Sequence, residues 1–207
     1  MTDRVAMYIL RTLLALTAFG LTIAVAAHFV GGRTAAAPFV AAYLVWVLSE
    51  ARITAGTPTQ SAAETRTLVP YAVARVATAL TAAYSAPAVR GMFGIILAGF
   101  FVAGVTLRAW AIHEFGRQYS HRVARICEGG LISSGPYRVL RHPAYAGMLL
   151  ANIGFAGYFA SPASIAALTL LVAAVMWRIR IEEGILTESP QYRAFANTRC
   201  RIVPGVW

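Results

Sequence analysis

Six apolar runs, separated by shorter polar segments, dominate the sequence. Their ranges are 5–30, 35–49, 68–86, 91–112, 144–160 and 163–177. A helix that crosses a bilayer needs about 20 apolar residues, so each run is long enough, or nearly so, to span it. The pattern predicts an all-α fold, a polytopic bundle of transmembrane helices with about six spans.

The last two runs are separated by Ser161-Pro162. Proline lacks a backbone donor and is favoured in the first turn of a helix. A break and a new helix are therefore expected at this point. The two short runs are predicted to form a helical hairpin inside the membrane.

Three polar stretches interrupt or follow the apolar runs. Residues 50–67 are rich in small and polar side chains and are interpreted as a loop. Residues 113–141 and 178–207 are longer, and the hairpin between them brings their ends together. We therefore divide the chain into N-terminal transmembrane helices, 1–112, and a C-terminal region, 113–207, that carries the chemistry.

The composition supports a membrane protein. The chain has 207 residues, of which 58% are hydrophobic and 13% are charged, whereas soluble domains have about 25% charged residues. Lipid is therefore the expected solvent for much of the surface, and the length suits one domain. Because no small-residue cleavage site closes the first run, we expect residues 5–30 to be a retained span and not a signal peptide.

The basic residues indicate the orientation. All 18 are arginine, and with eight acids they give a net charge of +10. With six spans only Arg33 and Arg90 fall outside, so the positive-inside rule places both termini in the cytosol. Arginines beside anionic headgroups account for the charge, and their division among loops argues against nucleic-acid binding. We expect the inner or plasma membrane of a bacterial-type cell.

Several common kinds of site have no sequence support. Cys127 and Cys200 lie in segments expected to be cytosolic, where thiols stay reduced, and they lack the paired spacing of a metal site. No Gly-x-Gly-x-x-Gly motif follows a strand pattern, and no P-loop or nucleophile-elbow serine is present. The sequence therefore predicts no metal, and no Rossmann-type cofactor.

Arg75 lies in the middle of a predicted span. An arginine there costs about 2.5–3.5 kcal/mol on insertion scales, so it should face the interior of the bundle or a wet cavity. Two interpretations remain open: a structural ion pair or snorkelling position, and a lining of a pocket.

The segment from Glu128 to Gly147 is the first candidate for chemistry. Its glycines and its Ser-Gly-Pro turn allow backbone amides to approach a ligand closely. Tyr137 and Tyr145 supply flat faces, and His142-Pro143 begins the hairpin with free amides that suit a carboxylate. Further donors are Arg138, Arg141 and His142. The alternative is an ordinary juxtamembrane loop whose arginines contact headgroups.

The second candidate is the Arg/Glu-rich segment 178–186. Arg178 and Glu182 are four residues apart, so they share one helix face, while Arg180 and Glu183 lie off that face. A simple surface ion pair is one interpretation. The helix leaves the membrane where the first segment enters it, so the pair can instead line a pocket.

These two segments resemble the signature of the isoprenylcysteine carboxyl methyltransferase family of integral membrane methyltransferases. The first part of the signature is Leu-Ile-Ser-Ser-Gly-Pro-Tyr-Arg-Val-Leu-Arg-His-Pro-Ala-Tyr-Ala-Gly, residues 131–147. The second follows a helical hairpin and comprises 178–186, Tyr192-x-x-Phe195, and then Arg199, Arg201 and Pro204. The resemblance covers about residues 108–207. The run between Leu186 and Tyr192 is shorter than is usual in the family.

The resemblance implies S-adenosylmethionine as the methyl donor, held on the cytosolic side by the C-terminal half. Carried over by position, the residues around this cofactor are Gly129, Gly130, Leu131, Ile132, Tyr137, His142, Pro143, Tyr145 and Glu182. Arg178 matches the arginine associated with the methyl acceptor, which is a carboxylate in the eukaryotic enzymes. Arg178 and His142 are the candidate catalytic residues.

Methyl transfer from a sulfonium requires alignment at about 3–3.5 Å and exclusion of water. We hypothesise that Glu182 orients the donor and that Arg178 positions an anionic or polar acceptor. A carboxylate or thiolate acceptor needs no general base, whereas a phenol or an amine needs one, and His142 is the candidate. The acceptor is expected to be lipophilic, entering from the bilayer: a prenylated cysteine carboxylate, a small thiol, a phospholipid amine or a polyketide phenol.

Two other functions are weighed against methyl transfer. Membrane sterol reductases, which use NADPH, carry a similar Arg-His-Pro-x-Tyr-x-Gly stretch, but they often have asparagine where this chain has Ala144. A non-catalytic membrane scaffold leaves the Arg178/Glu182 spacing unexplained. The sequence gives no signal for an oligomeric state.

Overall fold

The computed structural model describes residues 3–56, 62–89, 91–115 and 132–204. Within these ranges the chain is helical and contains no strand. The helices are α1 (Asp3–Val30), α2 (Ala36–Gly56), α3 (Ala62–Ala83), α4 (Gly91–Phe115), α5 (Pro143–Phe159), α6 (Pro162–Leu186), α7 (Pro190–Asn197) and the short 3-10 helix η2 (Gly135–Arg138). The expected all-α class is confirmed.

Three of the described helices are long and apolar enough to cross a membrane. They contain the spans Val5–Val30, Gly91–Glu114 and Pro162–Leu186, and α2 adds the shorter apolar stretch Ala36–Ala51. Large apolar side chains project outward from the bundle, among them Phe19, Val30, Phe93, Ile95 and Leu170. Long helices with exposed apolar faces are typical of lipid-facing surfaces, so the chain is a membrane protein.

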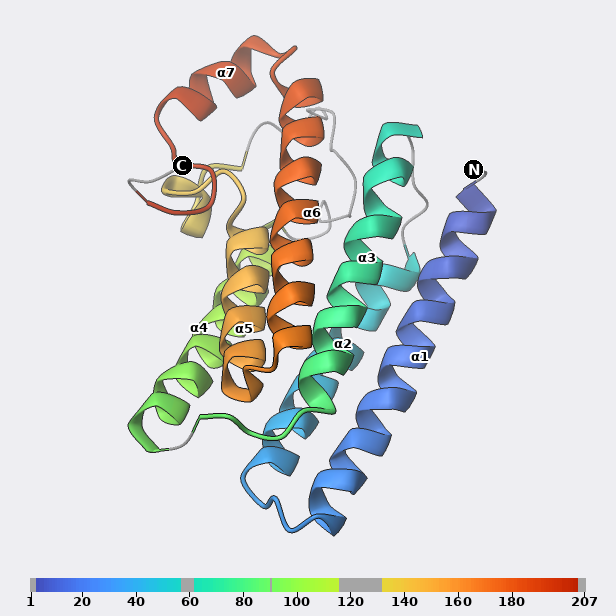
Figure 1. The fold of residues 1–207 in the computed structure, drawn as a ribbon. Helices are drawn as coiled ribbons and strands as arrows, with labels where there is room; N and C mark the ends of the chain where they lie inside the picture. The colour runs from blue at the N-terminus through green and yellow to red at the C-terminus, as the bar shows by residue number, and fades with distance from the viewer. Residues whose placement is uncertain (1–2, 57–61, 90, 116–131, 205–207) are drawn as a thin grey trace.

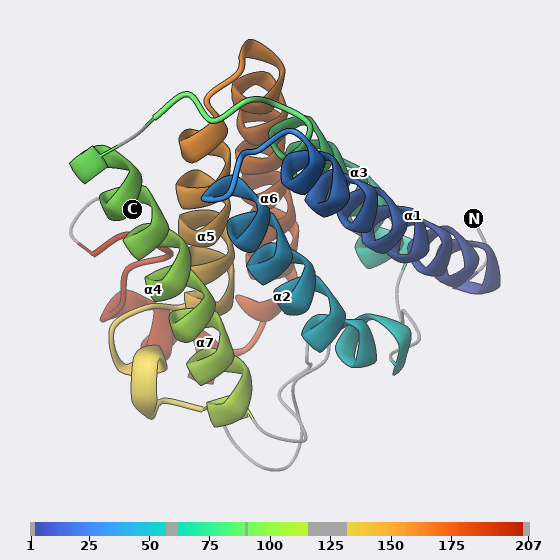
Figure 2. The ribbon, with the colours of Figure 1, turned by 90° about the horizontal axis from the view of Figure 1, so that it is seen from below.

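The helices run side by side in one bundle. α4 packs on α5, α3 packs on α6, and α1 packs on both α2 and α3 (Figures 1 and 2). η2, α7, the last turns of α6 and the C-terminal segment gather at one end, which we call the polar end, and the N-terminus of α1 lies at the same end (Figure 1). The start of α1 and the last described residues therefore lie toward the same end of the bundle.

The expected boundaries of one loop were wrong. The stretch 50–67 was expected to be a loop, but α2 continues to Gly56 and α3 begins at Ala62. α6 continues beyond its apolar run to Leu186, in agreement with the shared helix face expected for Arg178 and Glu182. In α2 the charged side chain of Glu50 finds partners inside the protein, so the helix extends beyond its apolar run.

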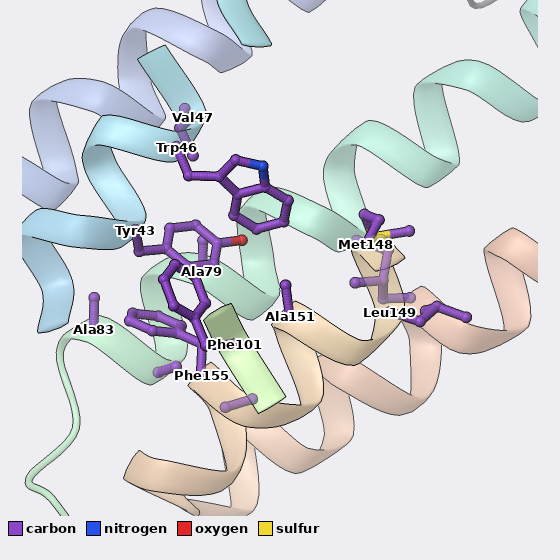
Figure 3. Close-up of a cluster of buried hydrophobic side chains, with 14 of the residues drawn as sticks. Tyr43, Trp46, Val47, Ala79, Ala83, Phe101, Met148, Leu149, Ala151 and Phe155 are labelled. Atoms are coloured by element: carbon purple, nitrogen blue, oxygen red, sulfur yellow. The ribbon is translucent and has the colours of Figure 1, made fainter. Parts of the chain in front are cut away.

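Aromatic side chains from three helices form the centre of the core. Figure 3 shows Tyr43 and Trp46 of α2 lying against Phe101 of α4 and Phe155 of α5. The ring centroids of Tyr43 and Phe155 are 4.2 Å apart. The hydroxyl of Tyr43 donates a hydrogen bond of 2.8 Å to Asn152 Oδ1, so this buried polar group is satisfied.

Small residues let α4 and α5 approach each other closely. A Cβ atom on Gly147 would lie 2.6 Å from the backbone nitrogen of Arg108 and 2.6 Å from the carbonyl oxygen of Gly104, which is too close for a side chain. Helices in membranes associate through such small residues because backbone contact replaces the missing hydrophobic driving force. The contact positions the first two turns of α5, which carry the His142–Gly147 motif.

The hairpin at Ser161-Pro162 is confirmed. Ser161 and Ser164 form a reciprocal capping box: the Ser164 backbone N–H donates to Ser161 Oγ at 3.1 Å, and the Ser161 N–H donates to Ser164 Oγ at 3.0 Å. Pro162 occupies the first turn of α6, where its missing N–H is not needed. The hairpin returns α6 to the polar end, beside the start of α5.

Candidate functional site

A triad of Tyr145, Glu182 and the buried Arg178 joins α5 to α6 near the polar end. The Tyr145 hydroxyl donates a hydrogen bond of 2.6 Å to Glu182 Oε1. Arg178 Nε donates to the Tyr145 oxygen at 2.6 Å and lies 3.0 Å from Glu182 Oε1. The Arg178 residue is only 1% exposed. The triad brings together three residues that the sequence singled out, and the expected pairing of Arg178 with Glu182 along one helix face is confirmed.

The guanidinium of Arg178 is also tied to the N-terminal half. Its Nη1 donates a hydrogen bond of 3.1 Å to Thr67 Oγ1 on α3. An arginine held by several partners presents its charge in a defined direction. The side chain is therefore anchored by α3, α5 and α6 together.

Glu183 is the centre of a second cluster. Its Oε1 accepts hydrogen bonds from Arg141 Nη1 at 3.1 Å and lies 3.3 Å from His142 Nε2, while its Oε2 accepts from Arg201 Nε at 2.7 Å. Successive helical residues point about 100° apart, so Glu182 and Glu183 meet different partners. The sequence pattern correctly placed Glu183 on a different face of the helix from Arg178. It did not predict that the C-terminal segment covers the face that carries Glu183.

His142 lies between the two carboxylates. Its Nε2 faces Glu183 and its Nδ1 is 4.0 Å from Glu182 Oε2. The residue is buried, and its ring centroid is 5.9 Å from that of Tyr145. As the N-cap of α5 it makes no side-chain capping bond, so both ring nitrogens are directed to the carboxylates rather than to the helix end.

The C-terminal segment pairs with the motif through its backbone. Leu140 and Cys200 form an isolated parallel bridge. The N–H of Arg141 donates to the Cys200 carbonyl at 2.8 Å, and the N–H of His142 donates to the Arg201 carbonyl at 3.0 Å. The two polar segments that the hairpin was expected to bring together do meet.

The remaining residues expected around the cofactor make no hydrogen bond or ion pair with the carboxylates of Glu182 and Glu183 in the described part of the chain. Ile132 and Tyr137 pack in a small apolar cluster with Ala111 of α4 and Ala144 of α5. Pro143 is buried as the first residue of α5. Gly129, Gly130 and Leu131 lie outside the described residues. The structure thus groups His142, Tyr145 and Arg178 around the carboxylates of Glu182 and Glu183. It places Ile132 and Tyr137 on the side of the motif that faces α4.

α7 covers the second cluster with an aromatic pair. Tyr192 and Phe195 are buried and pack with Leu186. Burial raises the pKa of Tyr192, and the nearby carboxylate of Glu183 raises it further. Within the described part of the chain the buried Tyr192 hydroxyl has no hydrogen-bond partner. The described residues contain no group of three or more metal-ligand side chains.

A buried ion network, which the sequence analysis did not predict, supports the start of α5. Arg75 Nη1 donates to Glu50 Oε2 at 2.7 Å, and Arg108 forms a further ion pair with the same carboxylate. Arg108 Nη1 also donates to the carbonyl of Ala144 at 3.0 Å. Arg75 also lies over the ring of Trp46, 4.7 Å from its centroid. Of the two interpretations of Arg75, the structural ion pair is present.

A sequence signal for this network existed. Arg75 and Arg108 each interrupt an apolar span, and Glu50 and Glu64 are the only acids between residues 5 and 112. Buried charges in a membrane pair with one another. Assigning Glu50 to a loop hid its role.

Comparison with known proteins relates part of the chain to one family of methyltransferases. Residues 96–188 match the isoprenylcysteine carboxyl methyltransferase family. Protein-S-isoprenylcysteine O-methyltransferase A of Arabidopsis thaliana is 32% identical over 123 residues, 55% of this chain and 59% of that protein. The protein-S-isoprenylcysteine O-methyltransferase of Schizosaccharomyces pombe is 35% identical over 121 residues, 51% of this chain and 48% of that protein.

The chain thus spans about half to three fifths of the length of these curated relatives. The matched region runs from within α4 to just beyond α6, so it contains the triad and all of the Glu183 cluster except Arg201. Residues 96–188 are thus similar to the isoprenylcysteine carboxyl methyltransferase family, and the match extends to the named plant and yeast relatives over about half of the chain.

Proposed function

We propose that this chain is an S-adenosylmethionine-dependent integral membrane methyltransferase that acts on a lipophilic acceptor. The observation that carries the proposal is the half-buried triad of Arg178, Tyr145 and Glu182. It places a cation and an anion side by side at the end of a membrane helix. Such a pair suits a reaction between a cationic methyl donor and an anionic acceptor.

The charges at the polar end fit the donor. S-adenosylmethionine supplies, when bound, a methyl group on a cationic sulfur, and it carries an amino acid end with both charges. Glu182 offers a carboxylate whose Oε1 is oriented by Tyr145, and the Glu183 cluster adds arginines beside it. The proposed donor-binding residues are Gly129, Gly130, Leu131, Ile132, Tyr137, His142, Pro143, Tyr145 and Glu182.

Arg178 is proposed to position the acceptor. Its guanidinium is held by Thr67 and Tyr145, so its orientation is set before the acceptor arrives and little ordering remains for binding. We favour a carboxylate acceptor of the isoprenylcysteine kind, because the similar plant and yeast proteins are named for O-methylation of that group.

A carboxylate attacks without a general base. For a phenol or an amine, His142 is the proposed base, because its ring is held between the carboxylates of Glu182 and Glu183. These carboxylates would stabilise the imidazolium that forms on proton transfer. Thiols are the remaining acceptor class that we propose to test.

We further propose that six helices cross the membrane with both termini in the cytosol, in the inner or plasma membrane of a bacterial-type cell. Residues 1–112 then form the membrane helices, and 113–207 form the methyltransferase region. Two observations support this topology: the arginine distribution, and the position of the N-terminus at the polar end with α7 (Figure 1). A lipophilic acceptor would enter sideways from the bilayer.

Calorimetry on the purified full-length protein in detergent tests the donor site. We expect S-adenosylmethionine to bind and NADPH not to bind. Glu182→Gln should weaken donor binding at least about 10-fold, since a charge-assisted contact is lost. The matched control Glu188→Gln, at an exposed position just beyond α6, should leave binding unchanged.

Transfer of a labelled methyl group to a panel of prenylated cysteines, lipophilic thiols, amines and phenols then identifies the acceptor. NADPH binding without S-adenosylmethionine binding would support a reductase and contradict the proposal. A protein that binds neither molecule would be a scaffold.

A further inference from the structure

One face of α3 carries a row of polar side chains into the bundle. Thr67, Tyr71 and Arg75 are spaced by four residues, so they lie above one another on the same face of the helix. α3 packs mainly on α6 and also contacts α5. The row begins beside the candidate site, because Thr67 accepts the hydrogen bond from Arg178.

The row contains two donor groups, the Tyr71 hydroxyl and Arg75 Nη2, that have no partner in the described part of the chain. The Tyr71 residue is 4% exposed, and its hydroxyl is buried with no hydrogen-bond partner among the described residues. Arg75 uses Nη1 for Glu50, while its Nη2 is buried and likewise without a partner there. A buried donor without a partner is destabilising, and native proteins contain few of them. Two on adjacent turns of one helix indicate a binding position for a ligand.

Tyr71 lies next to the triad. Its ring centroid is 6.3 Å from that of Tyr145, in an edge-to-face arrangement. The guanidinium groups of Arg178 and Arg75 are both close enough to interact electrostatically with it. The Tyr71 hydroxyl, without a partner among the described residues, is therefore on the helical turn after Thr67, which is bonded to the residue proposed to hold the acceptor.

The chemistry of the row distinguishes between ligands. An arginine nitrogen can only donate, and a neighbouring cation makes a phenol the better donor. Two donors with a positive charge suit an oxyanion and disfavour the cationic sulfur of the methyl donor. A carboxylate has enough lone pairs to accept from Arg178 and from this row together.

We infer that the Tyr71 hydroxyl, assisted by Arg75 Nη2, binds an oxygen of the carboxylate of the methyl acceptor, so that α3 of the N-terminal half sets the selectivity for the acceptor. This inference rests on the proposed methyl transfer. It assigns a role to a helix outside residues 96–188, the region that the family match covers.

Tyr71→Phe tests the inference because it removes only the hydroxyl. With a prenylated cysteine carboxylate as acceptor, kcat/KM should fall about 10- to 100-fold, mostly through KM, as expected for a lost hydrogen bond to a charged group. The affinity for S-adenosylmethionine should be unchanged. Arg75→Lys, which keeps a cation for Glu50 but removes Nη2, should shift KM in the same direction.

Tyr84→Phe is the control. Tyr84 follows α3 at the end away from Thr67, and its hydroxyl donates to the Gly20 carbonyl, so its loss should leave KM for the acceptor unchanged. Tyr71→Phe should keep or raise Tm, because it removes a buried group without a partner. If Tyr71 had only a structural role, Tyr71→Phe would lower Tm and leave KM for the acceptor unchanged.

An active wild-type protein with unchanged kcat/KM in Tyr71→Phe would overturn the inference and leave the methyltransferase proposal intact. A fall in S-adenosylmethionine affinity that accounts for the lost activity would also overturn it, by assigning Tyr71 to the donor. If the wild-type protein transfers no methyl group to any member of the panel, the proposed function and the inference fail together.

Discussion

Tyr145 and Glu182 are joined by a hydrogen bond of 2.6 Å that links the first turn of α5 to the last two turns of α6. The two residues are 37 positions apart, and the hairpin between them brings them into contact. The same phenol oxygen accepts from Arg178. One hydroxyl thus orients both the cation and the anion of the candidate site.

Replacing Tyr145 with phenylalanine tests this arrangement. The direct contact between Arg178 and Glu182, 3.0 Å in the wild type, should persist, so the protein should fold with a loss of about 1.5–3 kcal/mol for hydrogen bonds to charged groups. Methyl transfer should fall at least about 10-fold because the hydroxyl no longer fixes the orientation of the two charged side chains. Activity and thermal unfolding of the purified variant measure the two effects.

Tyr84→Phe is the control for this experiment. Tyr84 follows α3 at the end away from Thr67, and its exposed hydroxyl donates to the Gly20 carbonyl. Its removal should change neither activity nor Tm by much. Full activity in Tyr145→Phe would show that the hydroxyl does not orient the site.

Local signals predicted part of this structure correctly. Ser161-Pro162 indicated the hairpin, because serine caps the helix that it precedes and proline is favoured in the first turn of that helix. The spacing of Arg178 and Glu182 marked their pairing because residues four apart on a helix are neighbours. Both features depend on residues close in sequence, and sequence patterns report such contacts well.

Sequence patterns did not predict contacts between residues that are far apart in the chain. Glu50 was assigned to a loop because its partners Arg75 and Arg108 are 25 and 58 residues away. Glu183 was left off the site because Arg201 reaches it from the C-terminal segment. Tyr71 looked like an ordinary residue of a span, and only the packing of α3 against α5 and α6 gave it neighbours. The six-span count stays a prediction.

Glu50 should be more important for stability than either of its partners. Glu50→Gln removes the shared anion and leaves two buried arginines without it, and breaking a buried ion pair from one side costs about 3–5 kcal/mol. Arg75→Met should cost less, because Glu50 retains Arg108. Thermal unfolding and the yield of folded protein from membranes compare the variants. Equal stability of Glu50→Gln and the wild type would contradict a shared role for this carboxylate.

Tyr192 should make the folded state sensitive to alkaline pH. Burial raises its pKa in the folded protein, while the unfolded chain ionises near the ordinary value of about 10. The folded state therefore holds the proton more tightly, and this contribution to stability is present below about pH 10 and is lost as the pH rises towards the folded pKa. Stability of the wild type should fall with pH above this value.

Tyr192→Phe separates this effect from that of the other tyrosines. The hydroxyl has no partner among the described residues, so the variant should match the wild type near pH 7. Above about pH 10 it should lose stability less steeply. Denaturant titrations at a series of pH values measure the slopes, and parallel slopes would exclude Tyr192 as a contributor.

Gly147 should tolerate no side chain. A Cβ there meets the backbone of Arg108 and Gly104 at 2.6 Å, so Gly147→Ala forces α4 and α5 apart, at a cost of about 1–3 kcal/mol for overpacking. The separation should also weaken the hydrogen bond from Arg108 to the Ala144 carbonyl and so shift the start of α5. We therefore expect lower Tm together with reduced methyl transfer.

Gly99→Ala on α4 is the matched control for Gly147→Ala. A Cβ at Gly99 meets no atom within 4 Å, and alanine is the better helix former by about 0.8–1.0 kcal/mol. This variant should keep its activity and have an equal or higher Tm. If Gly147→Ala behaved like Gly99→Ala, the close contact between α4 and α5 would not be what positions the His142–Gly147 motif. The hydrogen bond from Arg108 and the hairpin would then have to position this motif.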